Sequence, residues 1–358
     1  MASPRRGYGL FERQAGARCQ AIAAPTADGG AAFIPAMFVT RWNCNGSAPV
    51  KSITADSAGD IFVYGPQLFI GQDATGTFAR SPQRGTVLAV SAVGRSVWML
   101  LDRCHGSGSK RCSLRLLESV SGGRNWHPAR TQPPGGVGGG APVKEPALGQ
   151  TWLLRTGVAS GYVLASPQST ASGEVGSASL SYTRNGGRTW TRSRVPCGQD
   201  FMSVVLTRAP GGALAAVCAG EPSAGSQGKM ITLSANGGRS WTKPTGCVLG
   251  SPCRGDAVLL DGYLSEIAAT SARTVYLIGS RGPLIVTSDG GRRWHQVSPA
   301  KGPVIGAENG GIAQIMFFGR SKGLAVGDNF AAGVVVVQIW RTADGGRKWS
   351  KPVVPALE

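Results

Sequence analysis

The sequence predicts an all-β protein built from repeated four-stranded units, and three observations support this prediction. Among its 358 residues, 54 glycines and 22 prolines supply turns, while 42% of the residues are apolar and can build a core. One eight-residue motif recurs along the chain. Alternating segments rich in β-branched residues precede the motif, as at 275–279 and 284–287. Many short strands joined by many turns explain all three observations.

The motif starts with Ser or Thr and continues with paired glycines, an arginine and a closing tryptophan. Its five copies run from Ser119 to Trp126, Thr183 to Trp190, Ser234 to Trp241, Thr287 to Trp294 and Thr342 to Trp349. A sixth, degenerate copy keeps the five-residue separation between Asp73 and Phe78 but has Thr75 in place of the second glycine.

The spacing of the motif predicts the architecture. The closing aromatic residues are 48, 64, 51, 53 and 55 residues apart, close to the ~40–50-residue period of propeller blades. We therefore expect one blade per copy in a single β-propeller over residues 49–358, with six blades favoured and seven as the alternative. Each blade has four antiparallel strands, and the motif forms the turn between the third and fourth. Residues 1–48, with the apolar stretch 33–39, form an N-terminal segment that supplies extra strands or part of a seventh blade.

The residue types of the motif point to a structural role. A carboxylate or amide at the third position accepts backbone N–H bonds inside a tight turn, the glycines adopt positive φ, and the first hydroxyl adds a further bond. The aromatic residue packs the turn onto the core. The polar residues concerned are Asp73, Asn185, Asn236, Asp289 and Asp344, and the aromatic residues are Phe78, Trp126, Trp190, Trp241, Trp294 and Trp349.

This pattern, Ser/Thr-x-Asp/Asn-Gly-Gly-Arg-x-Trp, resembles the Asp-box or bacterial neuraminidase repeat over about residues 50–355. The repeat occurs in sialidases, xyloglucan hydrolases, sortilin-type receptors and photosystem II assembly factors. The resemblance implies a β-propeller, and it leaves both enzymes and pure binding proteins open.

The cysteines predict an exported protein. Eight cysteines fall into sequence-near pairs, Cys19 with Cys44, Cys104 with Cys112, Cys197 with Cys218 and Cys247 with Cys253. No CxxC occurs and only three histidines are present, so disulfides are favoured over a metal, and no cofactor is expected. An extracellular, periplasmic or cell-surface location follows, although the chain shows no export signal and no apolar run of membrane-spanning length.

The net charge of +18 should attract polyanions. No basic run with interleaved aromatic residues indicates a specific nucleic-acid site, and arginines spread over a solvated surface explain the charge equally well. We expect a monomer that binds a glycan or a protein, with an anionic partner among the options.

The resemblance places the motif turns on the face opposite the usual binding face. The loops between second and third strands, and those between blades, would then carry the ligand site. They supply these candidate ligand-binding residues: Glu145, Asp200, Arg254, Asp256, Asp261, Tyr263, Glu266 and Glu308. The alternative is that these carboxylates are ordinary loop residues balancing nearby arginines.

We therefore expect a non-enzymatic binding or assembly module, and no catalytic residue is assigned. A glycoside hydrolase is the alternative. A sialidase resemblance would require an Arg-Ile-Pro motif, an arginine triad and a Tyr–Glu pair, but Phe33 stands before Ile34 and Pro35 where the arginine belongs. Tyr263, Glu266 and Arg254 would form a partial set. A β-glycan hydrolase would instead need only two carboxylates flanking a cleft.

Overall fold

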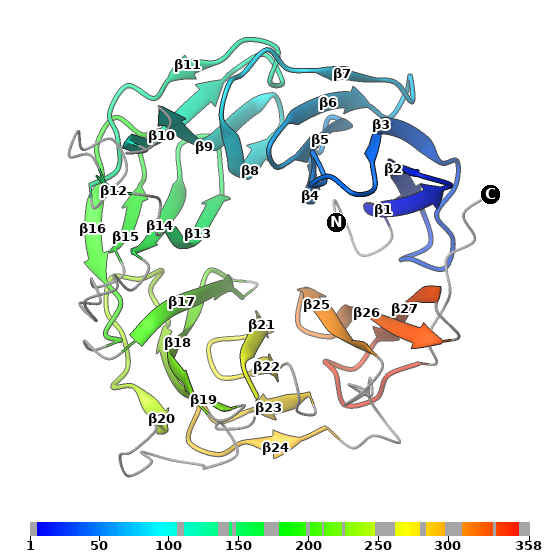
Figure 1. Cartoon of the computed structure of the whole chain (residues 1–358). Helices are drawn as coiled ribbons and strands as arrows, with labels where there is room; N and C mark the ends of the chain where they lie inside the picture. Colours follow the sequence, from blue (N-terminus) through cyan, green and yellow to red (C-terminus); the bar gives the residue numbers. More distant parts are fainter. Residues whose placement is uncertain are drawn as a thin grey trace. The chain divides into compact units, whose positions relative to one another are not determined.

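The computed structural model describes residues 6–105, 111–134, 143–144, 148–167, 179–197, 201–209, 211–223, 226–247, 262–279, 284–297, 310–331 and 334–350. Within these residues every element of regular structure is a β-strand, and the strands form seven successive antiparallel sheets (Figure 1). The chain divides into two compact units. The first contains the described residues up to 165 together with 179–192, and the second contains 166–167 and the described residues from 193 onward.

The first four sheets follow one another in sequence. They are β1 (Gly7–Ala15), β2 (Arg18–Thr26) and β3 (Met37–Asn43); β4 (Ser52–Ala55), β5 (Asp60–Tyr64), β6 (Leu68–Gln72) and β7 (Phe78–Arg80); β8 (Thr86–Val93), β9 (Ser96–His105), β10 (Arg111–Ser119) and β11 (His127–Pro128); and β13 (Leu148–Arg155), β14 (Gly161–Pro167), β15 (Ser179–Thr183) and β16 (Thr191–Arg194). A short strand, β12 (Val143–Lys144), pairs with β10.

The last three sheets repeat the same order. They are β17 (Phe201–Arg208), β18 (Leu214–Ser223), β19 (Ser226–Ser234) and β20 (Thr245–Cys247); β21 (Leu264–Ala269), β22 (Val275–Gly279), β23 (Ile285–Thr287) and β24 (His295–Gln296); and β25 (Gly310–Phe318), β26 (Lys322–Ala331) and β27 (Val334–Thr342). The prediction of an all-β fold with four-stranded antiparallel blades is confirmed.

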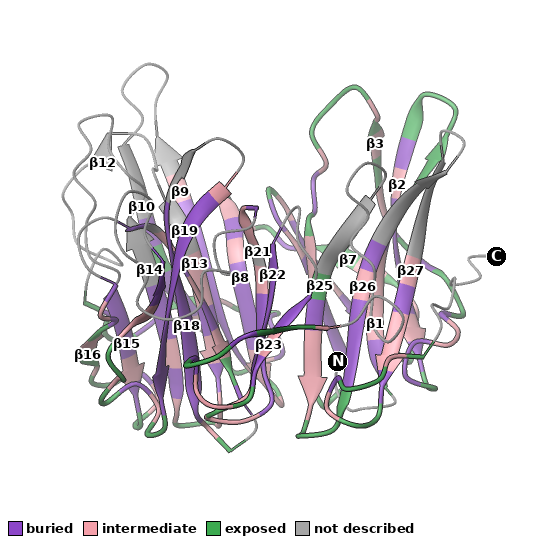
Figure 2. Cartoon of the chain, turned by 90° about the horizontal axis from the view of Figure 1, so that it is seen from below, coloured by how far each residue is buried: buried purple, intermediate pink, exposed green. Residues whose placement is uncertain are grey.

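The core lies between neighbouring sheets of each unit. The first strands pack side by side, β1, β4, β8 and β13 in the first unit and β17, β21 and β25 in the second. The second strands of the sheets are buried on both faces, as in β22, where all five residues are buried. Their sequences are therefore continuous apolar segments. Fourth strands such as β11 and β24 are exposed. Figure 2 shows this burial along the strands and the more exposed turns at their ends.

The expectation of six blades is wrong, because there are seven sheets. The additional sheet is β1–β3, and it contains a turn that the sequence pattern did not reveal. Residues 26–33 have Thr, Asp, paired glycines and a closing Phe at the motif positions, but alanine replaces the arginine. Phe33 precedes Phe78 by 45 residues, one blade period. One such turn therefore occurs in every blade, and we call the seven segments, 26–33, 73–78, 119–126, 183–190, 234–241, 287–294 and 342–349, the repeat turns.

Hydrogen bonds within a repeat turn involve both of its polar side chains. Asp289 Oδ1 accepts bonds from the Thr287 hydroxyl and from the N–H groups of Arg292 and Arg293, each at 3.0 Å. The Gly291 N–H donates to the Thr287 hydroxyl at 2.9 Å, and the two glycines have φ of 85° and 88°. Such values exclude most side chains, which explains the paired glycines.

The newly recognised turn at 26–33 has the same bonds. Asp28 Oδ1 accepts the Thr26 hydroxyl at 2.9 Å and the N–H groups of Ala31 and Ala32 at 2.7 and 3.1 Å. The Gly30 N–H donates to Thr26 Oγ1 at 2.8 Å. Neither the arginine nor the tryptophan of the motif is therefore needed to form the turn.

The turn at 73–78 departs from this arrangement. The N–H groups of Thr75 and Gly76 donate to the Gln72 carbonyl at 3.2 and 3.0 Å, so the backbone closes the turn without Asp73. Asp73 instead interacts with Tyr8. Burial, together with the charge of Asp73 and its hydrogen bond, raises the pKa of Tyr8 to about 12.

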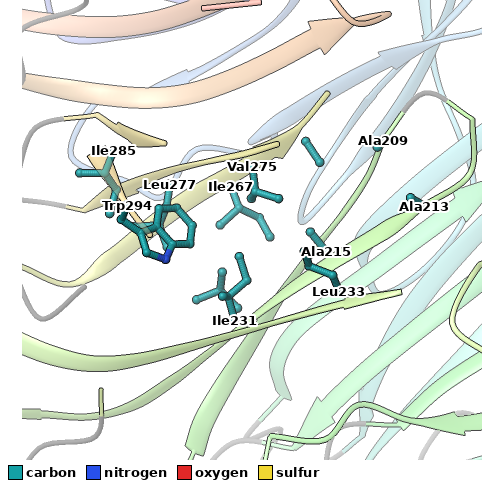
Figure 3. Packing of buried hydrophobic residues seen from close by; sticks show 12 residues of the cluster. Ala209, Ala213, Ala215, Ile231, Leu233, Ile267, Val275, Leu277, Ile285 and Trp294 are labelled. Atoms are coloured by element: carbon teal, nitrogen blue, oxygen red, sulfur yellow. The ribbon is translucent and has the colours of Figure 1, made fainter. Parts of the chain in front are cut away.

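The closing aromatic residues fasten the turns to the core. Trp294 is 4% exposed and belongs to a cluster of twelve buried residues. Figure 3 shows its indole beside Leu277 and Ile285. Trp190 packs on Trp98 with ring centroids 5.5 Å apart, and the indole N–H of Trp349 donates to the Gly346 carbonyl at 3.0 Å.

Asp289 should make stability depend on acid pH. Hydrogen bonds from the Arg293 N–H and its neighbours lower the pKa of this carboxyl. The stabilisation is therefore present above the unfolded-state value of about 3.9 and is lost as the pH falls through the lower folded-state value. Asn occupies the same position in two other repeat turns, so Asp289→Asn should retain the turn. We expect urea midpoints close to wild type at neutral pH and a smaller loss than wild type below about pH 4. A parallel loss in both proteins would contradict the assignment.

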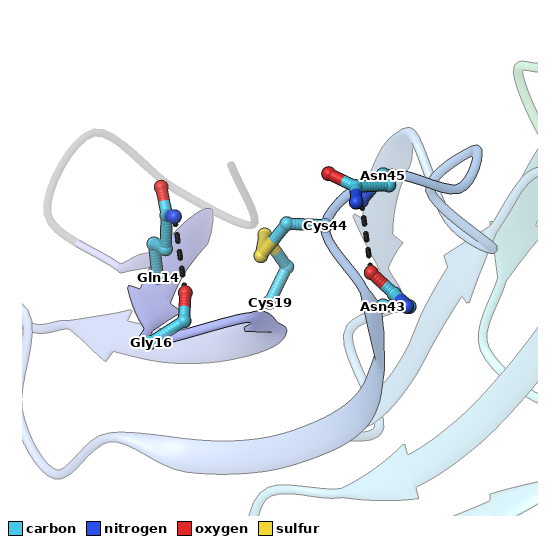
Figure 4. Close-up of a disulfide and its surroundings, with 6 residues drawn as sticks. All are labelled: Gln14, Gly16, Cys19, Asn43, Cys44 and Asn45. Carbon is cyan, nitrogen blue, oxygen red and sulfur yellow. Dashed lines mark hydrogen bonds between the residues drawn. A yellow bond between two sulfur atoms is a disulfide. The ribbon is translucent and has the colours of Figure 1, made fainter.

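Disulfides join cysteines on neighbouring segments. Cys19 is bonded to Cys44, as Figure 4 shows, and Cys197 is bonded to Cys218. Cys247 is buried and disulfide-bonded, whereas Cys253 lies outside the described residues. Cys104 and Cys112 are directly opposite each other in the β9–β10 pair. Two predicted pairs are thus confirmed, and the bonds 104–112 and 247–253 stay predictions.

Candidate functional site

Most predicted ligand-binding residues cannot be placed. Glu145, Asp200, Arg254, Asp256, Asp261 and Glu308 all lie outside the described residues. Tyr263 and Glu266 are described, and the structure brings both to the start of β21. The candidate site is therefore built around this strand of the second unit.

The start of β21 lies at the end of the strands that is remote from the repeat turns. β19 ends at Ser234, where a repeat turn begins, and its first residue, Ser226, is opposite Ser223 of β18. In the next sheet, Leu264 is opposite Gly279 at the corresponding end. We call this end, where second strands meet third strands, the loop end.

A fully buried lysine organises the loop end of the second unit. Lys229 is 1% exposed, and its Nζ donates to the carbonyls of Gln227 at 3.1 Å and Gly262 at 2.7 Å. Burying an ammonium group is costly unless hydrogen bonds replace its water. The segment that leads into β21 is therefore held in place by a charged group from β19.

Gln227 extends this network in two directions. Its Nε2 donates to the Gly220 carbonyl of β18 at 2.8 Å, and its Oε1 accepts the Leu264 N–H at 3.0 Å. Gln227 and Lys229 thus tie β18, β19 and β21 together. With Gly262, Tyr263 and Glu266 they form what we call the Lys229 cluster.

Glu266 has the electrostatics of a functional carboxyl group. Burial raises its pKa, although its Oε1 accepts the Ile267 N–H at 3.0 Å, which acts in the opposite sense. A register shift in the β21–β22 pair falls between Leu264 and Glu266, and such bulges re-aim side chains. A carboxyl group whose pKa is shifted by burial is a candidate for ligand binding.

Two disulfide-bonded cysteines flank the Lys229 cluster. Cys218 is opposite Met230, the residue after Lys229, and Cys247 is opposite Lys229 itself. The strands on either side of β19, β18 and β20, therefore each carry a disulfide-bonded cysteine. A rigid loop end of this kind lowers the entropy lost when a ligand binds.

Lys229 and Gln227 were not foreseen from the sequence. β19 is buried on both faces along nearly its whole length, so its sequence has no alternation of polar and apolar residues that would show which way the Lys229 side chain points. A lysine in a strand would ordinarily be expected on the exposed face. The sequence feature that could have indicated this buried lysine is its isolated position in an apolar third strand, next to strands that carry cysteines.

In the described part of the chain, no three His, Cys, Asp or Glu side chains are grouped to hold a metal ion. No helix with the length and apolarity of a membrane span occurs there either.

Comparison with known proteins identifies the fold. No protein-family profile and no curated protein matches this sequence. An ulvan lyase, a polysaccharide lyase with a bound saccharide, is similar in structure with a TM-score of 0.59 and 9% identity over 99% of this chain and 97% of the lyase. This chain is a β-propeller protein.

Solved structures with lower similarity include YCF48 and an arabinanase. YCF48 from Cyanidioschyzon merolae is 17% identical over 85% of this chain and 86% of its own, with a TM-score of 0.49. An α-L-arabinanase from Penicillium chrysogenum is 12% identical over 96% and 95%, with a TM-score of 0.44. At these identities, the propeller fold is what the comparisons establish.

Proposed function

We propose that this β-propeller is an exported binding or assembly module that holds a glycan or protein partner at its loop end. The Lys229 cluster is the observation that carries the proposal. A buried lysine with hydrogen bonds to two carbonyls fixes the chain entering β21, and Tyr263 and Glu266 follow directly on that segment. The predicted residues Asp256 and Asp261 precede it in sequence and lie outside the described residues.

The repeat turns support a structural scaffold beneath this surface. We infer that they are Asp-boxes, because the Thr26, Thr183, Thr287 and Thr342 turns combine a hydroxyl, an Asp or Asn and paired glycines in one hydrogen-bond pattern. The disulfides support export, since such bonds persist in oxidising compartments.

A sialidase-like enzyme is less well supported. Phe33, the residue compared with the first arginine of such enzymes, is 5% exposed and packs edge-on against Phe11 with centroids 5.2 Å apart. It closes a repeat turn and therefore belongs to the scaffold. Glycoside hydrolysis usually needs two carboxyl groups about 5–10 Å apart.

Activity and binding assays distinguish these functions. We expect no turnover of a fluorogenic sialoside, and retention on an array of immobilised neutral and acidic oligosaccharides. Glu266→Gln and Tyr263→Phe should each weaken retention about tenfold, whereas Tyr182→Phe, in the other unit, should not. Titration with salt separates this binding from attraction by the +18 charge. Turnover that Glu266→Gln abolishes in a folded protein would overturn the proposal.

A further inference from the structure

A polar hollow lies between two neighbouring sheets of the first unit, at the end that carries the repeat turns. Its volume is about 460 Å³, within the range of small-molecule sites. The sheet β4–β7 contributes Asp60, Gln72, Thr75, Thr77, Phe78, Arg80 and Ser81, and the repeat turn 119–126 contributes Gly122, Gly123 and Arg124.

Hydrogen bonds from one sheet to the next repeat turn close two corresponding junctions in the second unit. The hydroxyl of Ser193 donates to the Gly238 carbonyl and accepts the indole N–H of Trp241 at 3.2 Å. Thr245 likewise donates to the Gly291 carbonyl at 2.9 Å. In each case the acceptor is the second glycine of the next repeat turn.

The junction at the hollow lacks this closure. Ser81 follows Phe78 by three residues, as Ser193 follows Trp190, and the next repeat turn offers Gly123 and Trp126. However, the Ser81 hydroxyl and the Trp126 indole N–H are both buried without a hydrogen-bond partner among the described residues. Ser81 is 8% exposed and lines the hollow. Native proteins rarely leave buried polar groups unpaired, so the site has hydrogen-bonding capacity for a ligand.

A buried carboxylate lies in the wall of the hollow. Asp60 is 7% exposed, and its Oδ1 accepts the Gln72 amide at 3.1 Å. Its Oδ2 lies against Gly122, where a side-chain Cβ would collide with it. The Gln72 amide therefore orients the carboxylate, and the glycine at position 122 leaves the space that the carboxylate occupies.

The other lining groups define the chemistry of the ligand. Hydroxyl and amide groups can both donate hydrogen bonds to a polyol and accept them from it, whereas the carboxylate accepts hydrogen bonds from its hydroxyls. The Phe78 ring offers an apolar face of the kind that packs against a sugar ring. Arg80 and Arg124 are exposed at the edge of the hollow. Two guanidinium groups against one carboxylate favour a ligand with an acidic group.

We propose that this hollow binds an anionic monosaccharide unit of the hexuronate type. Asp60 and Ser81 bind its hydroxyls, Phe78 contacts its ring, and Arg124 pairs with its carboxylate. This site lies on the opposite ends of the strands from the loop end and does not depend on the function proposed there.

Calorimetric titration with D-glucuronate tests the site, with D-glucose and acetate as probes of its two halves. We expect saturable binding of glucuronate. Glucose and acetate should each bind at least about tenfold more weakly. Arg124→Gln should weaken glucuronate binding about tenfold, while Arg188→Gln, at the same position of the next repeat turn, should have no effect. Equal losses in both arginine variants, or no saturable binding at millimolar glucuronate, would overturn the proposal.

Removal of the serine hydroxyl gives an independent readout. Ser81→Ala should weaken glucuronate binding and leave Tm unchanged or raised, because the lost hydroxyl has no partner in the free protein. Ser193→Ala should lower Tm, because it breaks two bonds. If Ser81→Ala lowers Tm as much as Ser193→Ala, the hydroxyl is paired within the fold and the hollow is not a ligand site.

Discussion

Trp294→Ala should cost about 3–5 kcal/mol of unfolding free energy. The indole is 4% exposed and belongs to a cluster with residues from five strands of two neighbouring sheets, including Ile231, Leu277 and Ile285. Truncation to alanine would remove the apolar contacts and leave a cavity that the surrounding strands cannot fill. Urea denaturation monitored by far-UV circular dichroism measures the loss.

Asp289→Ala is the matched control within the same turn. It removes three hydrogen bonds to Asp289 Oδ1 but little apolar burial, so we expect a cost of about 1–2 kcal/mol. The turn would then contribute more by packing than by hydrogen bonding. Equal losses in the two variants would contradict that order. If both variants were stable but ligand binding disappeared, the repeat turns would have a direct role in function.

The blade architecture was predictable because the turn chemistry is local. Paired glycines with positive φ and a carboxylate two residues after a hydroxyl can be recognised without any tertiary contact. The first turn does not match the motif because it lacks the arginine and the tryptophan. In residues 26–33 both are replaced, while Thr26, Asp28 and Gly30 keep the bonds that form the turn.

The candidate sites were less predictable because they depend on contacts between distant segments. Lys229 meets the carbonyl of Gly262 across two sheets, and no local pattern in the sequence indicates this contact. The hollow beside Ser81 arises from bonds that one junction lacks and other junctions have. Such a difference becomes visible only when equivalent junctions are compared in three dimensions.

Gly123→Ala should destabilise the protein by about 2–5 kcal/mol, because two separate costs add at this position. Gly123 has φ of +80°, and a Cβ would lie 2.8 Å from Phe62 and 2.9 Å from Ile70. Thermal and urea denaturation of the variant measure the sum of backbone strain and overpacking.

Gly94→Ala separates the two costs. Gly94 has φ of +53° in the β8–β9 hairpin, and a Cβ there would meet no atom within 4 Å, so the expected loss is about 1 kcal/mol from backbone strain alone. The difference between the variants is the cost of pushing Phe62 and Ile70 aside. Because Ile70 also lines the hollow, it has space to move into. Equal losses of unfolding free energy in the two variants would therefore mean that the hollow absorbs the added methyl group. In that case the affinity for glucuronate should fall in Gly123→Ala and remain unchanged in Gly94→Ala.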